Sequence, residues 1–115
     1  MTAATTAAVT VAVMVALTTE ADQQHAEALA QQLLDRRLVA CVSLQPVTSL
    51  YRWHGRIERS QEVQLLCKTS ASALPALEAA VRALHSYDTP EWLVWPATAS
   101  ADYAAWLAGV VAPGG

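Results

Sequence analysis

The chain has 115 residues, of which 54% are hydrophobic and only 15% are charged, and its formal net charge is −3. This length fits one domain with a hydrophobic core of its own. The acidic balance and the lack of any basic run exclude nucleic acid and anionic membranes as expected partners. So few charged residues cover a small surface poorly, which favours an oligomer that hides part of that surface.

The sequence carries no recognisable targeting or membrane segment. No apolar run approaches the roughly 18 residues that span a bilayer. A secretory signal requires a basic residue before its apolar run, and no Lys or Arg precedes the apolar run that begins at Val9. Cys41 and Cys67 both lie in apolar, strand-like runs, and we interpret them as buried thiols in a reducing compartment. We therefore expect a cytoplasmic protein.

The first predicted element is a strand. Residues 1–8 are small and polar, and we expect a disordered N-terminal segment there, followed by a single domain over residues 9–112. The continuous apolar run Val9–Leu17 predicts a central strand of the sheet. Thr18 and Thr19 are expected to end this strand.

A helix and a second strand follow. Thr19 and Asp22 approximate a capping box, and the apolar residues after them recur at helical spacing up to the arginine pair at 36–37. The next apolar run, Leu38–Leu44, predicts a strand. Because proline cannot donate a ladder hydrogen bond, Pro46 is expected to end it.

Residues 48–69 predict a long β-hairpin. Its turn is His54-Gly55, because glycine accepts the positive φ that a tight hairpin turn requires. A hairpin of this length reaches past the edge of a small domain, and an isolated ribbon is marginally stable in water. We expect its end, with Tyr51 and Trp53, to contact another subunit. The alternative is an exposed tip with one partly buried Trp.

The second half of the chain predicts two more helices around a short strand. Ser70–Ser72 offers N-caps for a helix that tolerates Pro75 in its first turn. Glu91–Trp95 predicts a short strand ended by Pro96, and Ser100 opens a helix that stops before the final Pro-Gly-Gly. The order of elements is typical of an α+β fold of the split βαβ type, with an antiparallel sheet and a C-terminal helix.

The segment His85–Glu91 is the one polar cluster with chemical interest. It places an imidazole, a phenol (Tyr87) and two carboxylates (Asp88 and Glu91) in a short loop after a helix. One interpretation is a helix cap with loop hydrogen bonds, because an imidazole at a helix C-terminus is favoured when protonated. The other is a weak, open site for a divalent metal or small ligand, since histidine with carboxylate suits copper or zinc.

The remaining candidate residues favour structural roles. His25 has no second ligand four residues on, and we interpret it as a surface residue. His54 is interpreted as a turn residue, although a turn tip could also touch a neighbouring chain. The cysteines form no Cys-x-x-Cys clip for a soft metal. No phosphate loop, nucleophile elbow or H-E-x-x-H motif is present, so we do not expect an enzyme. Acid–base chemistry by His85 with Tyr87 or Asp88 is the weaker alternative.

Five sequence motifs follow one another between about residues 9 and 111. They are Leu38-Val39-Ala40-Cys41-Val42, the T-S-x-Y-x-W-x-G hairpin at 48–55, Glu62-Val63 to Lys68-Thr69, the H-x-Y-x-x-P-E loop at 85–91, and Asp102-Tyr103 with Trp106-Leu107. On these residues the chain resembles the CutA divalent-cation tolerance family.

The resemblance implies a ferredoxin-like fold in a PII-like homotrimer, in which the hairpin reaches a neighbouring subunit through Tyr51, Trp53, His54 and Gly55. It implies binding of divalent metal ions, with Cu(II) as the first candidate and other divalent cations as alternatives. It implies no required cofactor. The family's metal residues carry over to His85 and Glu91. A cysteine expected after the first strand does not, because Leu17 stands about there, followed by Thr18. The alternative function is a PII-like signalling or interaction module that binds a small ligand or partner at the inter-subunit clefts.

Overall fold

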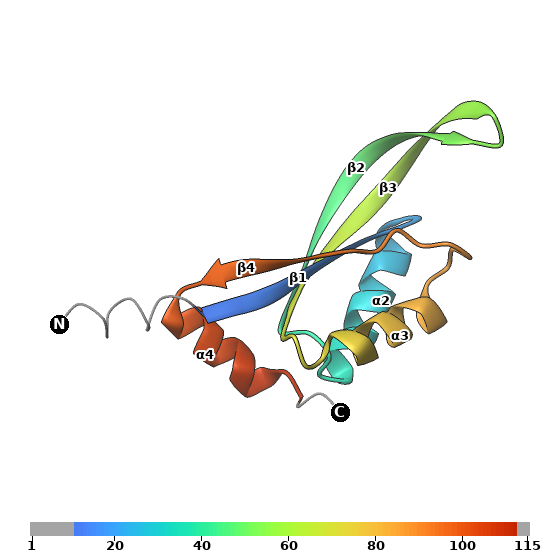
Figure 1. Cartoon of the computed structure of the whole chain (residues 1–115). Helices are drawn as coiled ribbons and strands as arrows, with labels where there is room; N and C mark the ends of the chain where they lie inside the picture. The colour runs from blue at the N-terminus through green and yellow to red at the C-terminus, as the bar shows by residue number, and fades with distance from the viewer. Residues whose placement is uncertain (1–10, 113–115) are drawn as a thin grey trace.

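The computed structural model describes residues 11–112, which form four strands and three helices (Figure 1). The expected N-terminal segment, residues 1–8, lies outside the described residues. In chain order the elements are β1 (Val11–Glu20), α2 (Gln23–Asp35), β2 (Cys41–Trp53), β3 (Arg56–Thr69), α3 (Leu74–Leu84), β4 (Leu93–Ala99) and α4 (Ala101–Val110). No helix among these residues is long and apolar enough to cross a membrane.

The strands form one antiparallel sheet in the order β2-β3-β1-β4. β1 lies between β3 and β4 and pairs antiparallel with both, which confirms that the first apolar run forms a central strand. β2 pairs with β3 over the whole hairpin, from Cys41 opposite Lys68 to Trp53 opposite Arg56. β2 and β4 are therefore the two edge strands of this sheet. The sheet and helices confirm the α+β prediction.

The main core lies between one face of the sheet and helices α2 and α3. Because side chains alternate along a strand, Ala16 of β1 shares this face with Leu65 and Cys67 of β3. These residues pack with Leu33 of α2 and Leu77 of α3, and all five are fully buried. Burial raises the pKa of Cys67 to about 12, so its thiol stays protonated at neutral pH. Cys67 is the core thiol that the sequence predicted.

A second, smaller core joins α4 to the end of the sheet. Leu107 and Ala104 of α4 pack against Val13 of β1. The backbone N–H of Ala112, just after α4, donates to the carbonyl of Arg37 at 2.8 Å. Arg37 has a φ of 57°, the left-handed conformation that often ends a helix. The residue just after the C-cap of α2 thus also anchors the end of α4.

Two prolines lie inside strands that they were expected to end, and both of those predictions were wrong. Pro46 lies within β2, and Pro96 lies within β4. Both strands are edge strands, where a residue without an N–H can point its nitrogen away from the neighbouring strand and lose no ladder bond. As a result, the predicted strand Leu38–Leu44, from Cys41 onward, and the first arm of the hairpin are one continuous strand.

The first strand also extends beyond its predicted end, through Thr18 and Thr19 to Glu20. The predicted capping box is therefore wrong. Asp22 alone is the N-cap of α2, and its carboxylate accepts a hydrogen bond from the His25 N–H at 2.8 Å. The extra strand residues matter because they carry polar side chains into the site described below.

The hairpin of β2 and β3 projects away from the helices and curls at its end (Figure 1). Its turn residues His54 and Gly55 have φ values of 49° and 75°, which confirms the predicted turn. In the single copy Trp53 is 56% exposed, and Tyr51 is exposed as well. Their burial against a neighbouring subunit therefore stays a prediction.

The turn supplies a direct test of backbone strain. A methyl group added at Gly55 meets no atom within 4 Å. Gly55→Ala should therefore act through its positive φ alone and lower the free energy of unfolding by about 1 kcal/mol. Urea denaturation at one fixed protein concentration measures the change. His54→Asn, which tolerates the same conformation, should not destabilise the protein. Equal stability of Gly55→Ala and wild type would contradict the assignment.

Candidate functional site

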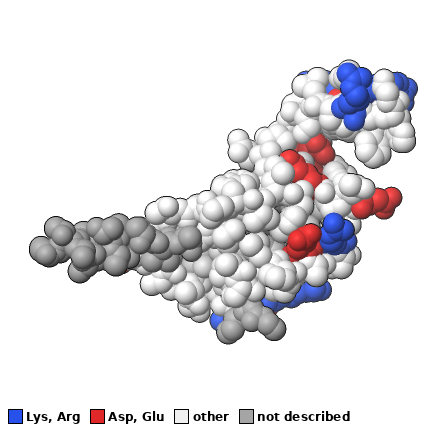
Figure 2. Space-filling model, viewed as in Figure 1, with Lys and Arg blue, Asp and Glu red and all other residues white. Residues whose placement is uncertain are grey.

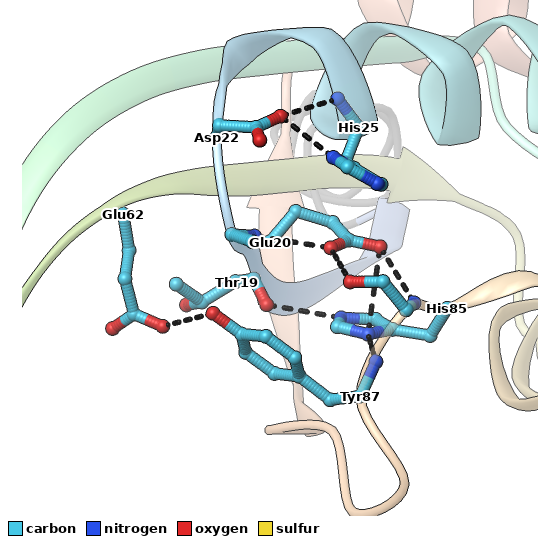
Figure 3. Close-up of polar contacts among 9 residues, drawn as sticks. Thr19, Glu20, Asp22, His25, Glu62, His85 and Tyr87 are labelled. Carbon is cyan, nitrogen blue, oxygen red and sulfur yellow. Dashed lines mark hydrogen bonds and ion pairs between the residues drawn. The ribbon is translucent and has the colours of Figure 1, made fainter.

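His85 follows the last turn of α3, and its side chain is fully buried. The ring Nε2 lies 2.9 Å from the carbonyl oxygen of Thr19, and Nδ1 lies 3.0 Å from the backbone nitrogen of Tyr87 (Figure 3). A carbonyl only accepts and a backbone N–H only donates, so Nε2 carries the proton and Nδ1 accepts. The imidazole is therefore neutral in this arrangement, and both ring nitrogens are engaged.

Glu20, at the end of β1, is a buried carboxylate that holds the loop after α3. It accepts hydrogen bonds from the backbone N–H of Ser86 at 3.0 Å, from the Ser86 hydroxyl, and from the Ala21 N–H at 3.0 Å. Burial alone raises the pKa of Glu20, but the bonds from Ser86 and Ala21 outweigh it, and the net pKa is lowered. His85 Nδ1 lies 3.5 Å from Glu20 Oε2. Glu20 is therefore ionised at neutral pH.

Thr19 connects the two residues that the sequence proposed as metal ligands. Its carbonyl accepts from His85, and its hydroxyl donates to Glu91 Oε1 at 2.6 Å. His85 and Glu91 thus meet through Thr19, with no hydrogen bond between their side chains. The imidazole is buried behind Thr19, whereas Glu91 is exposed just before β4.

Tyr87 joins the same loop to the hairpin. Its phenol donates to Glu62 Oε2 on β3 at 2.6 Å (Figure 3). Burial raises the pKa of Tyr87, and the hydrogen bond to Glu62 raises it further. The phenol therefore remains a donor at neutral pH. This bond fixes the position of the loop relative to the base of the hairpin.

A wide cleft of about 1060 Å³ lies between the hairpin and this loop. Its walls contain three carboxylates and three aromatic rings and lack Lys, Arg and His. The lining residues are Thr19, Ser49, Leu50, Tyr51, Trp53, Glu62, Gln64, Ser86, Tyr87, Asp88, Thr89 and Glu91. Figure 2 shows the acidic side chains gathered below the hairpin end, which is basic. The electrostatics of the cleft favour cations.

The described residues form no closed metal site within one copy. Among the described residues, no three His, Cys, Asp or Glu side chains are close enough together to hold a metal ion. Where the resemblance leads us to expect a cysteine, Leu17 is followed by Thr18. Thr18 is fully buried, and its hydroxyl has no hydrogen-bond partner in the described part of the chain. An ion in this cleft would therefore be bound weakly, through oxygen donors first.

The other candidate residues lie away from the cleft walls or at its rim. His25 is exposed and contacts Asp22 at 2.8 Å, as expected of a surface residue. His54 lies in the hairpin turn, with its ring 4.9 Å from that of Trp53. Cys41 is half-buried, and Lys68 Nζ lies 3.7 Å from its sulfur. None of these side chains lies where it could bind a metal ion together with His85 or Glu91.

The sequence analysis missed three residues that organise the site, namely Thr19, Glu20 and Glu62. Thr19 was assigned to a helix start, and neither Glu20 nor Glu62 was given a role in the site. A usable signal was present, because Thr-Thr-Glu directly follows an apolar strand run without a turn residue. Their contacts lie 25 to 72 residues away along the chain, beyond the range of local patterns.

Comparisons with known proteins place this architecture among its relatives. A family model described as "CutA1 divalent ion tolerance protein" matches residues 14–110. The chain belongs to this family. A curated relative, the "Divalent-cation tolerance protein CutA" of Pectobacterium atrosepticum, is 45% identical over 95 residues, covering 81% of this chain and 86% of the relative. The resemblance seen in the motifs is confirmed.

Solved CutA structures share the fold. CutA from Synechococcus elongatus is 36% identical, with a TM-score of 0.85 over 88% of this chain and 91% of that one. CutA from Archaeoglobus fulgidus, described as a periplasmic divalent cation tolerance protein, is 28% identical, with a TM-score of 0.83 over 89% and 100% of the two chains. The relatives from Pectobacterium atrosepticum and Archaeoglobus fulgidus are named for divalent-cation tolerance.

The buried carboxylate predicts a defined pH dependence. Glu20→Gln should lower the free energy of unfolding at pH 7 by about 2 kcal/mol, because bonds to a charged acceptor are replaced by weaker ones. The folded-state pKa of Glu20 is below its ordinary value of 4.5, so its stabilisation is complete above that pH and is lost as pH falls through the lower value. Urea unfolding at pH 7, 5 and 3 should show the difference from wild type shrinking only at the lowest pH.

The control for this series is Glu27→Gln on the exposed surface of α2, where a carboxylate accepts only from Gln23. It should change stability by a few tenths of a kcal/mol at most. If Glu20→Gln behaved like Glu27→Gln at every pH, the carboxylate would not be what holds the loop.

Proposed function

We propose that this chain is a non-enzymatic, homotrimeric protein of divalent-cation tolerance that binds divalent cations, copper first among them, in the cleft beside the His85 loop. The observation that carries the proposal is the lining of that cleft. Three carboxylates face it without a basic residue in its walls, in a chain whose family is named for divalent ions. Such a lining attracts cations and repels anions.

Glu91 and His85 are the proposed metal-contacting residues. Glu91 is exposed, and its carboxylate has a lone pair free for an ion beyond the bond from Thr19. The His85 imidazole is buried behind Thr19, which separates it from Glu91. Its Nε2 becomes a metal ligand only if the ring turns away from the Thr19 carbonyl. Oxygen donors without a thiolate suit a weak, exchangeable ion, which is cargo and not a structural cofactor.

The sheet supports a cyclic assembly. Its order and antiparallel pairing fit a ferredoxin-like arrangement, and both edge strands are open within one copy. β4 exposes Leu93, Val94 and Trp95, and natural proteins rarely leave an apolar edge uncovered. If the β4 edge of one copy meets the β2 edge of the next, the contact is head-to-tail, and a rotation of 120° between copies closes it as a ring of three. We propose that this ring is a PII-like trimer that buries Trp53.

A cytoplasmic location is proposed on the state of the cysteines. Both Cys41 and Cys67 are free thiols, as expected in a reducing compartment. The periplasmic description of the Archaeoglobus fulgidus protein is a statement about that relative.

A PII-like role as a binding module for a small ligand is the second candidate. The cleft, at about 1060 Å³, is large enough to admit a small organic ligand, which is the observation that favours this alternative. The acidic lining disfavours nucleotides and other anions. Calorimetry with ATP and with copper separates the candidates, and binding of ATP without copper would reverse their order.

The metal proposal is tested by Glu91→Gln, because this exposed substitution leaves the core intact. Isothermal titration of tag-free protein with Cu(II) should show affinity reduced by at least about tenfold. Asp102→Asn on exposed α4 removes a carboxylate elsewhere and should leave the affinity unchanged. Equal affinities of the two variants would remove Glu91 from the site. Equal affinities of His85→Ala and His25→Ala, in folded protein, would remove His85.

The trimer is tested at Trp53. Sedimentation velocity of the wild type should show a trimer at micromolar concentration. Trp53→Ala should weaken assembly by several kcal/mol, on the order of a core aromatic deletion, because the indole is expected to fill a neighbour's surface. The exposed indole of Trp106 provides the matched control, Trp106→Ala. A monomeric wild type would refute the trimer, and an unchanged Trp53→Ala trimer would refute the role of Trp53.

A further inference from the structure

A cluster of nucleophilic side chains lies outside the cleft, at the foot of the hairpin and away from its turn. Cys41, the first residue of β2, is directly opposite Lys68 of β3 in the strand register. The Lys68 nitrogen Nζ lies 3.7 Å from the Cys41 sulfur and donates to the Ser43 hydroxyl at 2.5 Å. None of these three residues lines the cleft beside the His85 loop. The cluster is therefore separate from the proposed cation site.

Lys68 differs from the other basic residues of the chain. It is the only lysine, and all the other residues counted as Lys or Arg are arginines. Among the ion pairs that the described residues form, none involves Lys68. Arginine supplies a positive charge equally well, whereas only lysine can lose a proton and act as a nucleophilic amine. The residue type at this position thus favours a chemical role over a purely electrostatic one.

The two cysteines of the chain differ in the same sense. Cys67 is next to Lys68 in sequence, but alternation along β3 turns its side chain into the core, where it is fully buried and stays protonated. Cys41 is half-buried, and its sulfur contacts the Lys68 ammonium group. Reactive cysteines are partly exposed and lie beside cationic side chains, whereas buried ones are inert. Cys41 is therefore the thiol of this chain that can react.

We propose that Cys41 and Lys68 form an acyl-transfer site, in which a small acyl thioester acylates Cys41 and the acyl group then moves to Lys68. In the first step the Cys41 thiolate attacks the carbonyl carbon of the donor. A thioester forms at Cys41, and the thiolate of the donor leaves.

The second step transfers the acyl group within the protein. The Lys68 ammonium group first gives a proton to water, and the neutral amine then attacks the carbonyl carbon of the new thioester. The carbon–sulfur bond breaks, a carbon–nitrogen bond forms, and the proton that the nitrogen loses goes to the Cys41 sulfur. Because an amide is more stable than a thioester, the transfer runs in one direction and regenerates the thiol.

The geometry suits this second step. An acyl carbon on Cys41 is one bond away from a sulfur that lies 3.7 Å from Nζ, so rotation about the Cβ–Sγ bond brings the carbon within reach of the amine. The hydrogen bond to Ser43 holds Nζ beside the sulfur. The product is a neutral acyl-lysine in place of the only lysine charge of the chain.

The test incubates the purified, full-length protein with the acetyl thioester of N-acetylcysteamine. The wild type should gain an acetyl group on Lys68 that resists hydroxylamine, located by mass spectrometry on the tryptic peptide 60–82, which acylation of Lys68 leaves uncut. In Cys41→Ser the rate of this acetylation should fall by at least about tenfold, because the amine then meets the donor only by diffusion. Cys67 lies in the same peptide and should stay unmodified.

Lys68→Arg separates acyl transfer from charge. This variant keeps a positive charge beside Cys41 and removes the nucleophilic amine, so it should stop at a thioester on Cys41 that hydroxylamine cleaves. Circular dichroism verifies that both variants fold, and Cys41→Ala gives the same comparison if serine destabilises the protein.

Three results would overturn the proposal. They are equal rates of Lys68 acetylation in the wild type and Cys41→Ser, no thioester on Cys41 in Lys68→Arg, and no acetylation of Lys68 in the wild type. None of these results bears on the cation site at Glu91 or on the contact of Trp53, because neither uses Cys41 or Lys68.

Discussion

The buried carboxylate of Glu20 is the constraint on which the candidate site depends. An ionised group in the interior is costly unless donors satisfy it, and here the donors come from the loop after α3. Satisfying Glu20 pins that loop to the end of the central strand. The pinned loop then buries His85 against Thr19 and holds Glu91 toward the cleft. A structural requirement in the core thus sets the geometry of the candidate site.

The second organising feature is the mismatch between the hairpin and the body of the molecule. β2 and β3 continue past the helices, so their outer parts have no core to pack on within one copy (Figure 1). The bond from Tyr87 to Glu62 ties the base of this hairpin to the His85 loop and creates the cleft between them. The same two elements therefore bound the cleft, and Tyr51 and Trp53 of the hairpin are exposed side chains in its walls. The proposed cation site and the proposed subunit contact thus lie beside each other.

Sequence patterns predicted those helices and turns whose formation depends only on neighbouring residues. Helical spacing identified α2 and α3, and the glycine after His54 identified the turn, because periodicity and positive φ are properties of neighbouring residues. The predictions that Pro46 and Pro96 end their strands were wrong because they depend on distant residues. Whether Pro46 ends a strand depends on whether that strand lies at an edge, and sheet order is set by pairings far apart in sequence. The family was identified from the sequence motifs alone.

The sequence by itself determined the α+β class, the hairpin, the family and the loop that carries His85 and Glu91. Only the tertiary structure decided what that loop does. It showed that the buried His85 imidazole donates to a strand carbonyl, that Thr19 and Glu20 belong to β1 and not to a helix start, and that Glu62 and Asp88 join Glu91 around one cleft. The physical reason is that hydrogen-bond satisfaction is a property of the folded interior. Which acceptor a donor reaches depends on residues brought together from distant parts of the chain.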